Sequence, residues 1–118
     1  MQIHLTATPP TDIRLHARVI NQGAAITGLD ATFVEGAAAS RFTGRAGQLF
    51  EGFANLGGSV KRIALAGAGE TDAADRRANL ERAGAALTAK YLASGETAMV
   101  VDLANAGLSA DDAAAVLL

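Results

Sequence analysis

Two glycines follow an apolar run in SVKRIALAGAGE, residues 59–70, and glycines in that setting can cradle a phosphate. Gly67 and Gly69 supply the first half of the Gly-x-Gly-x-x-Gly fingerprint of dinucleotide-binding turns. Asp72 stands where the third glycine belongs, and its carboxylate would repel a pyrophosphate. The turn also lacks the Gly-Lys-Ser/Thr ending of a P-loop. We interpret the glycines as the exit from a buried strand, where they adopt positive φ freely.

The two histidines are the next candidates, because imidazoles are common metal ligands. If the turn TPPTD at 8–12 closed a symmetric hairpin, His4 would lie opposite His16. The chain has no cysteine, and no carboxylate shares the face of either strand to complete a site. We therefore expect two solvent-facing histidines on amphipathic strands and no metal ligands.

Carboxylates and hydroxyls offer no catalytic pattern. Four aspartates stand at expected helix starts, where capping and the helix dipole explain them: Asp72, Asp75, Asp111 and Asp112. The four serines, at 40, 59, 94 and 109, lack the Gly-x-Ser-x-Gly setting of a hydrolase nucleophile. The sequence therefore predicts no catalytic, cofactor-binding or metal-binding residue in this chain.

The composition limits the kinds of molecule that this chain is expected to bind. Ten basic and 12 acidic residues give a net charge of −2, which argues against nucleic acid or an anionic membrane as the main partner. Arg41 and Arg45 flank Phe42, but two arginines around one aromatic residue are typical of a solvated loop edge. The absence of cysteine suits a reducing compartment, and no signal peptide or membrane-spanning run is evident, so we expect a cytoplasmic protein.

Hydrophobic periodicity indicates the elements that would position these residues. Alternation of apolar and polar residues predicts strands over 2–7 and 13–19. An i, i+4, i+8 pattern predicts a helix over 29–40. Further strands are expected over 46–53, 60–66 and 98–103. A long helix is expected from an Asp72 cap to Ala93, and a last helix after a Ser109 cap. One stripe of the long helix is expected to be buried, namely Leu80, Ala83, Gly84, Leu87 and Tyr91.

The order strand, helix, strand over 60–103 is long enough for a parallel crossover. We therefore predict an α/β class, with a mixed, mostly parallel sheet and helices on its faces. The 118 residues suit a single domain, 1–118. The last helix ends on AAAVLL without a cap or a basic residue, so we expect the natural chain to continue.

Several blocks resemble the N-terminal domain of the cytosolic leucyl aminopeptidases in sequence, order and separation. They are RFTGRAGQLFEGF (41–53), VKRIALAGAGE (60–70), an alanine-rich helix, TAMVVDL (97–103) and a helix ending AAAVLL. The resemblance covers about residues 29–118. In that family the second strand is apolar and lies deep in the sheet, whereas here Arg14, His16 and Arg18 alternate along it.

The resemblance implies a macro-domain-like fold and a homohexameric, cytoplasmic parent enzyme. That parent removes N-terminal amino acids from peptides with two divalent ions, zinc or manganese, held in a C-terminal catalytic domain. This chain contains none of the metal-binding or catalytic motifs, so the resemblance implies a non-catalytic domain that serves assembly or substrate access. Two other functions stay open: an ADP-ribose or nucleotide module at the Gly67–Gly69 turn, and a DNA-binding domain.

Overall fold

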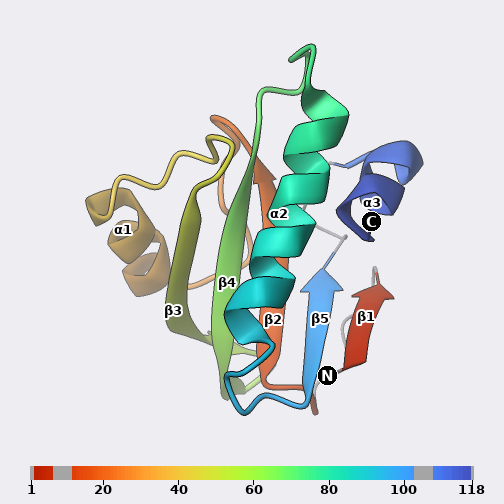
Figure 1. Cartoon of the computed structure of the whole chain (residues 1–118). Coiled ribbons are helices and arrows are strands. Elements are labelled where there is room, and N and C mark those ends of the chain that lie inside the picture. Colours follow the sequence, from red (N-terminus) through yellow and green to blue (C-terminus); the bar gives the residue numbers. More distant parts are fainter. Residues whose placement is uncertain (1, 7–11, 103–107, 118) are drawn as a thin grey trace.

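The computed structural model describes residues 2–6, 12–102 and 108–117 (Figure 1). The strands in these residues are β1 (Gln2–Thr6), β2 (Leu15–Asn21), β3 (Leu49–Leu56), β4 (Ser59–Gly69) and β5 (Ala98–Asp102). The helices are α1 (Ala31–Ala39), α2 (Arg76–Tyr91) and α3 (Ala110–Leu117). Most of the predicted turn at 8–12, together with Ala7, Leu103 and Leu118, lies outside the described residues.

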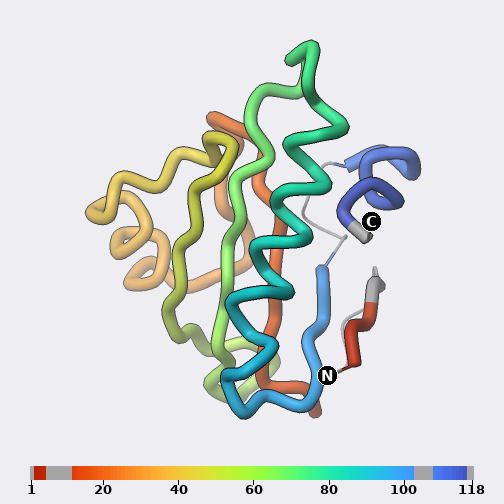
Figure 2. Tube along the Cα trace, viewed as in Figure 1, coloured from red at the N-terminus to blue at the C-terminus, as the bar shows by residue number. Residues whose placement is uncertain are grey.

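The strands form one sheet in the order β1-β5-β2-β4-β3. The first four of these are parallel, and β3 pairs with β4 in the antiparallel sense. This confirms the predicted α/β class with a mixed, mostly parallel sheet. Figure 2 shows how β1 from the start of the chain lies beside β5 from near its end.

The hairpin that would place His4 opposite His16 does not form, because β1 pairs with β5 and not with β2. The second strand is also more central than an amphipathic pattern suggests. It lies between β5 and β4, and six of its residues, from Leu15 to Ile20, are buried. Alternating polar residues predict a solvated face, but here His16 and Arg18 are buried as polar side chains with partners inside the protein.

Helices cover both faces of the sheet. On one face α2 packs on β4 and β2, and α3 packs on α2 (Figure 1). The predicted stripe on α2, from Leu80 to Tyr91, is buried in this core. On the other face Phe33 and Ala37 of α1 join Ile63 and Leu65 of β4 in a second apolar cluster.

The helix starts follow local capping chemistry. The Asp30 carboxylate accepts a hydrogen bond of 2.9 Å from the Phe33 N–H and so caps α1. Ser109 accepts one of 3.1 Å from the Asp112 N–H and caps α3, as predicted. The predicted Asp72 cap of the long helix is wrong, because α2 begins one turn later at Arg76.

The β3–β4 hairpin closes through Gly57 and Gly58, both at positive φ, 64° and 88°. Two successive residues at positive φ match the twist of a tight antiparallel hairpin, and glycine adopts them without strain. The strand covers Leu49–Leu56 and not the predicted 46–53, since Asn55 and Leu56 pair with Val60 and Ser59.

Candidate interaction site

Gly67 lies inside β4, and Gly69 is its last residue, with a positive φ of 75°. The strand-exit interpretation therefore holds for Gly69. The Gly67 N–H donates to the Gln48 carbonyl, and the Gly69 N–H donates to the Gly44 carbonyl, each at 2.9 Å. A Cβ on Gly67 would stand 2.0 Å from the Arg45 carbonyl oxygen. These glycines therefore let a neighbouring loop approach the strand, and their amides are already bonded to that loop.

The two histidines lie on opposite sides of β5, since both His4 and His16 are in register with Val100. Two strand spacings of about 4.8 Å separate their backbones, and an apolar side chain stands between them. His4 is exposed, as expected, whereas His16 is buried. Among the described residues, no group of three or more His, Cys, Asp or Glu side chains could hold a metal ion.

The remaining sequence candidates have structural partners. The Asp75 carboxylate accepts from the Asn79 amide at 3.2 Å, and Asp112 pairs with Arg76 at 3.1 Å. Ser40 and Ser94 each donate to a helix carbonyl three residues earlier. Asp111 lies in the first turn of α3, where an acid suits the helix dipole, as predicted.

The Arg41–Phe42–Arg45 segment is a loop edge, as expected. Phe42 packs partly buried against the α1 cluster, while the two arginines are exposed. The Gln48 side chain organises the loop, because its oxygen accepts from the Thr43 and Arg45 N–H groups and its nitrogen donates to the Arg41 carbonyl.

A buried ion pair lies at the centre of the sheet. The Arg18 Nε stands 3.5 Å from the Asp102 Oδ2, and both side chains are almost fully buried. Arg18 also donates to the Thr27 carbonyl, and burial lowers the pKa of its guanidinium while Asp102 opposes that shift. This pair joins β2 to β5 and is closed to solvent, so it belongs to the interior and offers no binding surface.

His16 is held in the same buried region. Its Nε2 lies 2.7 Å from the Ile13 carbonyl, so that nitrogen carries the proton, while its buried Nδ1 has no hydrogen-bond partner within the described part of the chain. Burial lowers the pKa of His16. The Ile13 carbonyl and the Asp102 charge oppose this shift, and the Lys61 and Arg18 charges add to it. The imidazole is therefore neutral in the folded protein.

Acid should destabilise the fold through His16. Because its folded pKa is lowered, the unfolded chain binds the proton first, and the free energy of unfolding falls as the pH drops below about 6.5. Urea denaturation at a series of pH values measures this slope. The variant His16→Gln should flatten it and His4→Gln should not; an unchanged slope in His16→Gln would contradict this assignment.

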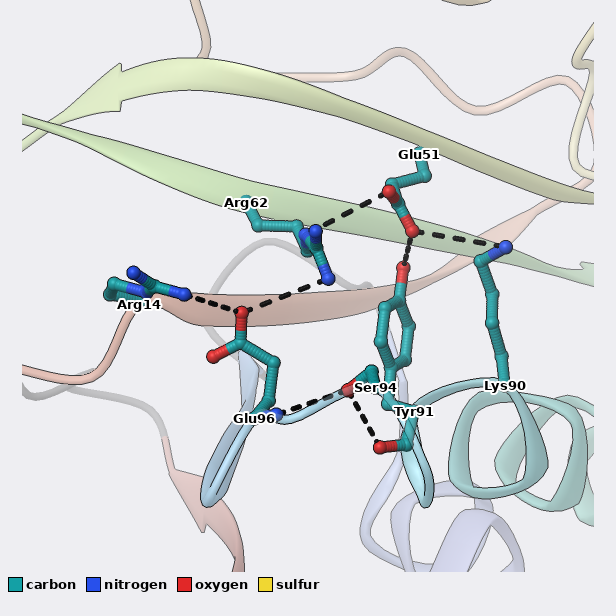
Figure 3. A network of polar contacts seen from close by, with 7 residues as sticks. All are labelled: Arg14, Glu51, Arg62, Lys90, Tyr91, Ser94 and Glu96. Atoms are coloured by element: carbon teal, nitrogen blue, oxygen red, sulfur yellow. Dashed lines mark hydrogen bonds and ion pairs between the residues drawn. The ribbon is translucent and has the colours of Figure 1, made fainter.

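A second polar network lies on the α2 side of the sheet, where Arg62 links a group around Glu51 to a group around Glu96 (Figure 3). Glu51 of β3 is its centre. The Glu51 carboxylate accepts from the Tyr91 hydroxyl at 2.5 Å, and it lies 3.8 Å from the Lys90 Nζ and 3.8 Å from the Arg62 Nε. These contacts tie the end of α2 to β3 and β4.

Glu96, in the loop between α2 and β5, continues this network. Its Oε1 lies 3.1 Å from an Arg14 nitrogen and 3.7 Å from an Arg62 nitrogen (Figure 3). The Glu96 N–H donates to the Ser94 Oγ, which in turn donates to the Tyr91 carbonyl, so the segment after α2 is fixed. Two carboxylates thus meet three basic side chains and one phenol.

The chain's single tyrosine reports directly on this network. Burial, the hydrogen bond to Glu51 and the negative charge of that carboxylate raise the pKa of Tyr91. Its phenolate absorbance should therefore appear only well above pH 10, the ordinary value for tyrosine being about 10. The variant Glu51→Gln should start that titration at lower pH, and ionisation near pH 10 in the wild type would contradict the geometry.

Exposed apolar side chains stand beside this network. Leu49, Phe53 and Val60 are 39%, 61% and 65% exposed, and we call them the apolar strip. Register places Leu49, Glu51 and Phe53 opposite Ala66, Ala64 and Arg62 of β4, on the face that carries α2. A depression of about 350 Å³ indents the strip, between Phe53, Val60, Arg62, Arg14 and Glu96.

A larger and more open depression adjoins it at the amino ends of the strands. It measures about 700 Å³ and is lined by His4, Asp12, Arg14 and Glu96, among others. Arg14 and Glu96 line both depressions, so their ion pair forms the ridge between them. The sequence did not predict this arrangement. One available signal was Tyr91 in the buried stripe, since a buried phenol requires a hydrogen-bond partner.

Comparison with protein-family models and with curated proteins found no match for this chain. No helix in residues 2–6, 12–102 and 108–117 is long and apolar enough to cross a membrane.

Proposed function

We propose that this chain is the non-catalytic N-terminal domain of a cytoplasmic leucyl aminopeptidase and that it acts by contact. The sequence blocks given above resemble that domain, and the five-stranded α/β sheet is compatible with it. The parent would remove N-terminal amino acids from peptides as a homohexamer, with two zinc or manganese ions in its C-terminal domain. This domain would pack on the catalytic domain or on a neighbouring subunit.

One observation carries the proposal: the charged groups on the α2 side bind one another, while apolar side chains beside them face solvent. Glu51 and Glu96 each have at least two partners within the chain. Phe53 and Val60 are about two-thirds exposed. Such a surface is suited to packing against protein, because burying exposed apolar area is favourable and the neighbouring charges are already paired.

The test uses the catalytic domain that the proposal places after these residues in the same gene. Sedimentation velocity should detect a complex when the two parts are mixed, and the complex should hydrolyse a leucyl peptide when manganese is added. The chain alone should not. A downstream sequence without a two-metal peptidase domain, or two parts that never associate, would overturn the proposal.

The two other functions are open to direct measurement. Calorimetry with ADP-ribose tests a nucleotide module, although the amides of Gly67 and Gly69 are already bonded to the Gly44–Gln48 loop. A gel shift with duplex DNA at increasing salt tests DNA binding, since phosphate contacts weaken steeply with salt.

A further inference from the structure

We infer that the apolar strip binds an amphipathic helix with acidic flanks, supplied by a protein partner. The inference rests on the proposed function, because it names the surface and the chemistry of the contact. The strip consists of Leu49, Phe53 and Val60, as defined above.

A helix layer is missing over this part of the sheet. The helices described for the α2 side are α2, which packs on β4 and β2, and α3, which packs on α2 (Figure 1). β3 has α1 behind it and no described helix in front. Sheets of α/β proteins normally carry helices on both faces, and neighbouring helices pack 8–10 Å apart. The space beside α2 and in front of β3 is therefore a position for one more helix.

The strip has the length that a short helix can cover. From Leu49 to the level of Val60, which pairs with Asn55, it follows six steps of β3, or roughly 20 Å at about 3.4 Å per residue. A helix of about 13 residues has that length. The depression of about 350 Å³ beside Phe53 and Val60 can accept one large apolar side chain of such a helix.

The charges around the strip select acidic flanks. Arg14 and Lys90 keep 75% and 40% of their side chains exposed, while those of Glu96 and Glu51 are only 9% and 30% exposed. The basic partners thus shield the carboxylates from solvent. A binding partner would therefore contact mainly basic side chains at this surface. Complementary charge at the rim of an interface favours the correct partner and repels the wrong one.

The same observations disfavour two other occupants. A second copy packed strip to strip would bring Arg14 and Lys90 near their own counterparts, where like charges repel. An extended segment added to the free edge of β3 would lie beside the strip in the plane of the sheet. The side chains of Phe53 and Val60 point away from that plane, so such a segment would leave them in solvent.

The test uses two synthetic helical peptides of about 14 residues. Both carry leucine at helical spacing, and the remaining positions are glutamate in one peptide and lysine in the other. Fluorescence anisotropy with the intact chain should show binding of the glutamate peptide, weakened by salt, and at least about tenfold weaker binding of the lysine peptide. Amide shifts should gather on β3, the start of β4 and the end of α2.

Variants separate the strip from the rest of the surface. Phe53→Lys and Val60→Lys should each weaken binding of the glutamate peptide at least about tenfold. Ile3→Lys, at an exposed isoleucine of β1 on the opposite edge of the sheet, should change that binding less than about twofold. Circular dichroism confirms that each variant folds. Absent binding, equal binding of both peptides, or self-association of the chain that Phe53→Lys abolishes would overturn the inference. None of these outcomes would stop the two parts of the aminopeptidase from associating, so the proposed function is judged separately.

Discussion

Replacing Gly84 by alanine should destabilise the protein by about 3 kcal/mol or more, through a clash between two helices. A Cβ on Gly84 would stand 1.8 Å from the Val116 carbonyl oxygen and 2.8 Å from the Val116 carbonyl carbon, which belong to the backbone of α3. A backbone cannot rotate away as a side chain can, so α3 must move off α2. We expect a lower thermal midpoint and weaker protection of the α3 amides from hydrogen exchange.

Gly36 provides a matched control, because it is also a helical glycine without positive φ. A Cβ there would meet only the Phe50 ring, at an ordinary contact distance of 3.6 Å. Gly36→Ala should therefore stabilise the protein by up to about 1 kcal/mol, the usual difference between alanine and glycine in a helix. If the two variants changed stability equally, the close approach of α3 to α2 would not explain why position 84 requires glycine.

The second large effect should come from Asp102→Asn, which leaves the Arg18 charge buried without its carboxylate. Removing one partner of a buried ion pair costs about 3–5 kcal/mol, since an uncompensated charge remains in the interior. Both side chains are almost fully buried, and their atoms are 3.5 Å apart. Chemical denaturation should show a loss of that size.

Two comparisons make this result specific. Glu81→Gln breaks the exposed pair between Arg77 and Glu81 on α2, and should cost only a few tenths of a kcal/mol. The double variant Arg18→Met with Asp102→Leu should recover much of the loss, because it removes both charges together. A small loss in Asp102→Asn would show that solvent reaches Arg18.

The elements that the sequence predicted well are those whose pattern matches their burial. The stripe from Leu80 to Tyr91 repeats at helical spacing, and the structure buries every member of it. The apolar run from Ile63 to Ala66 is buried on both faces of a central strand. In both places local periodicity and tertiary packing demand the same side chains, so a single sequence contains the information.

The errors arose where a distant partner overrides the local pattern. Arg18 and His16 alternate with apolar residues and so predict a solvated face, but Asp102, more than 80 residues away, makes burial of Arg18 possible. Pairing of β1 with β5 also depends on residues at the two ends of the chain. Nothing in the segment 2–19 itself distinguishes that partner from the adjacent strand.

The sequence predicted a strand at the interaction site but not the site itself. Alternation of Leu49, Glu51 and Phe53 predicted a strand with one shared face. Glu51 bonds to the end of α2, whereas Leu49 and Phe53 stay exposed because the strand order places β3 at the edge of the sheet. Glu96 and Arg14 come together because both lie next to the amino ends of parallel strands, and a single sequence does not show which strands are neighbours.

Peptidase activity is the measurement that bears most directly on the account, because its central claim is that this domain contributes contact and not chemistry. The purified chain, supplied with manganese or zinc, is predicted to release no leucine from a leucyl peptide above the rate of buffer, whereas its mixture with the downstream domain is predicted to release it. Turnover by the chain alone that survives repurification and is abolished by chelation would contradict the account.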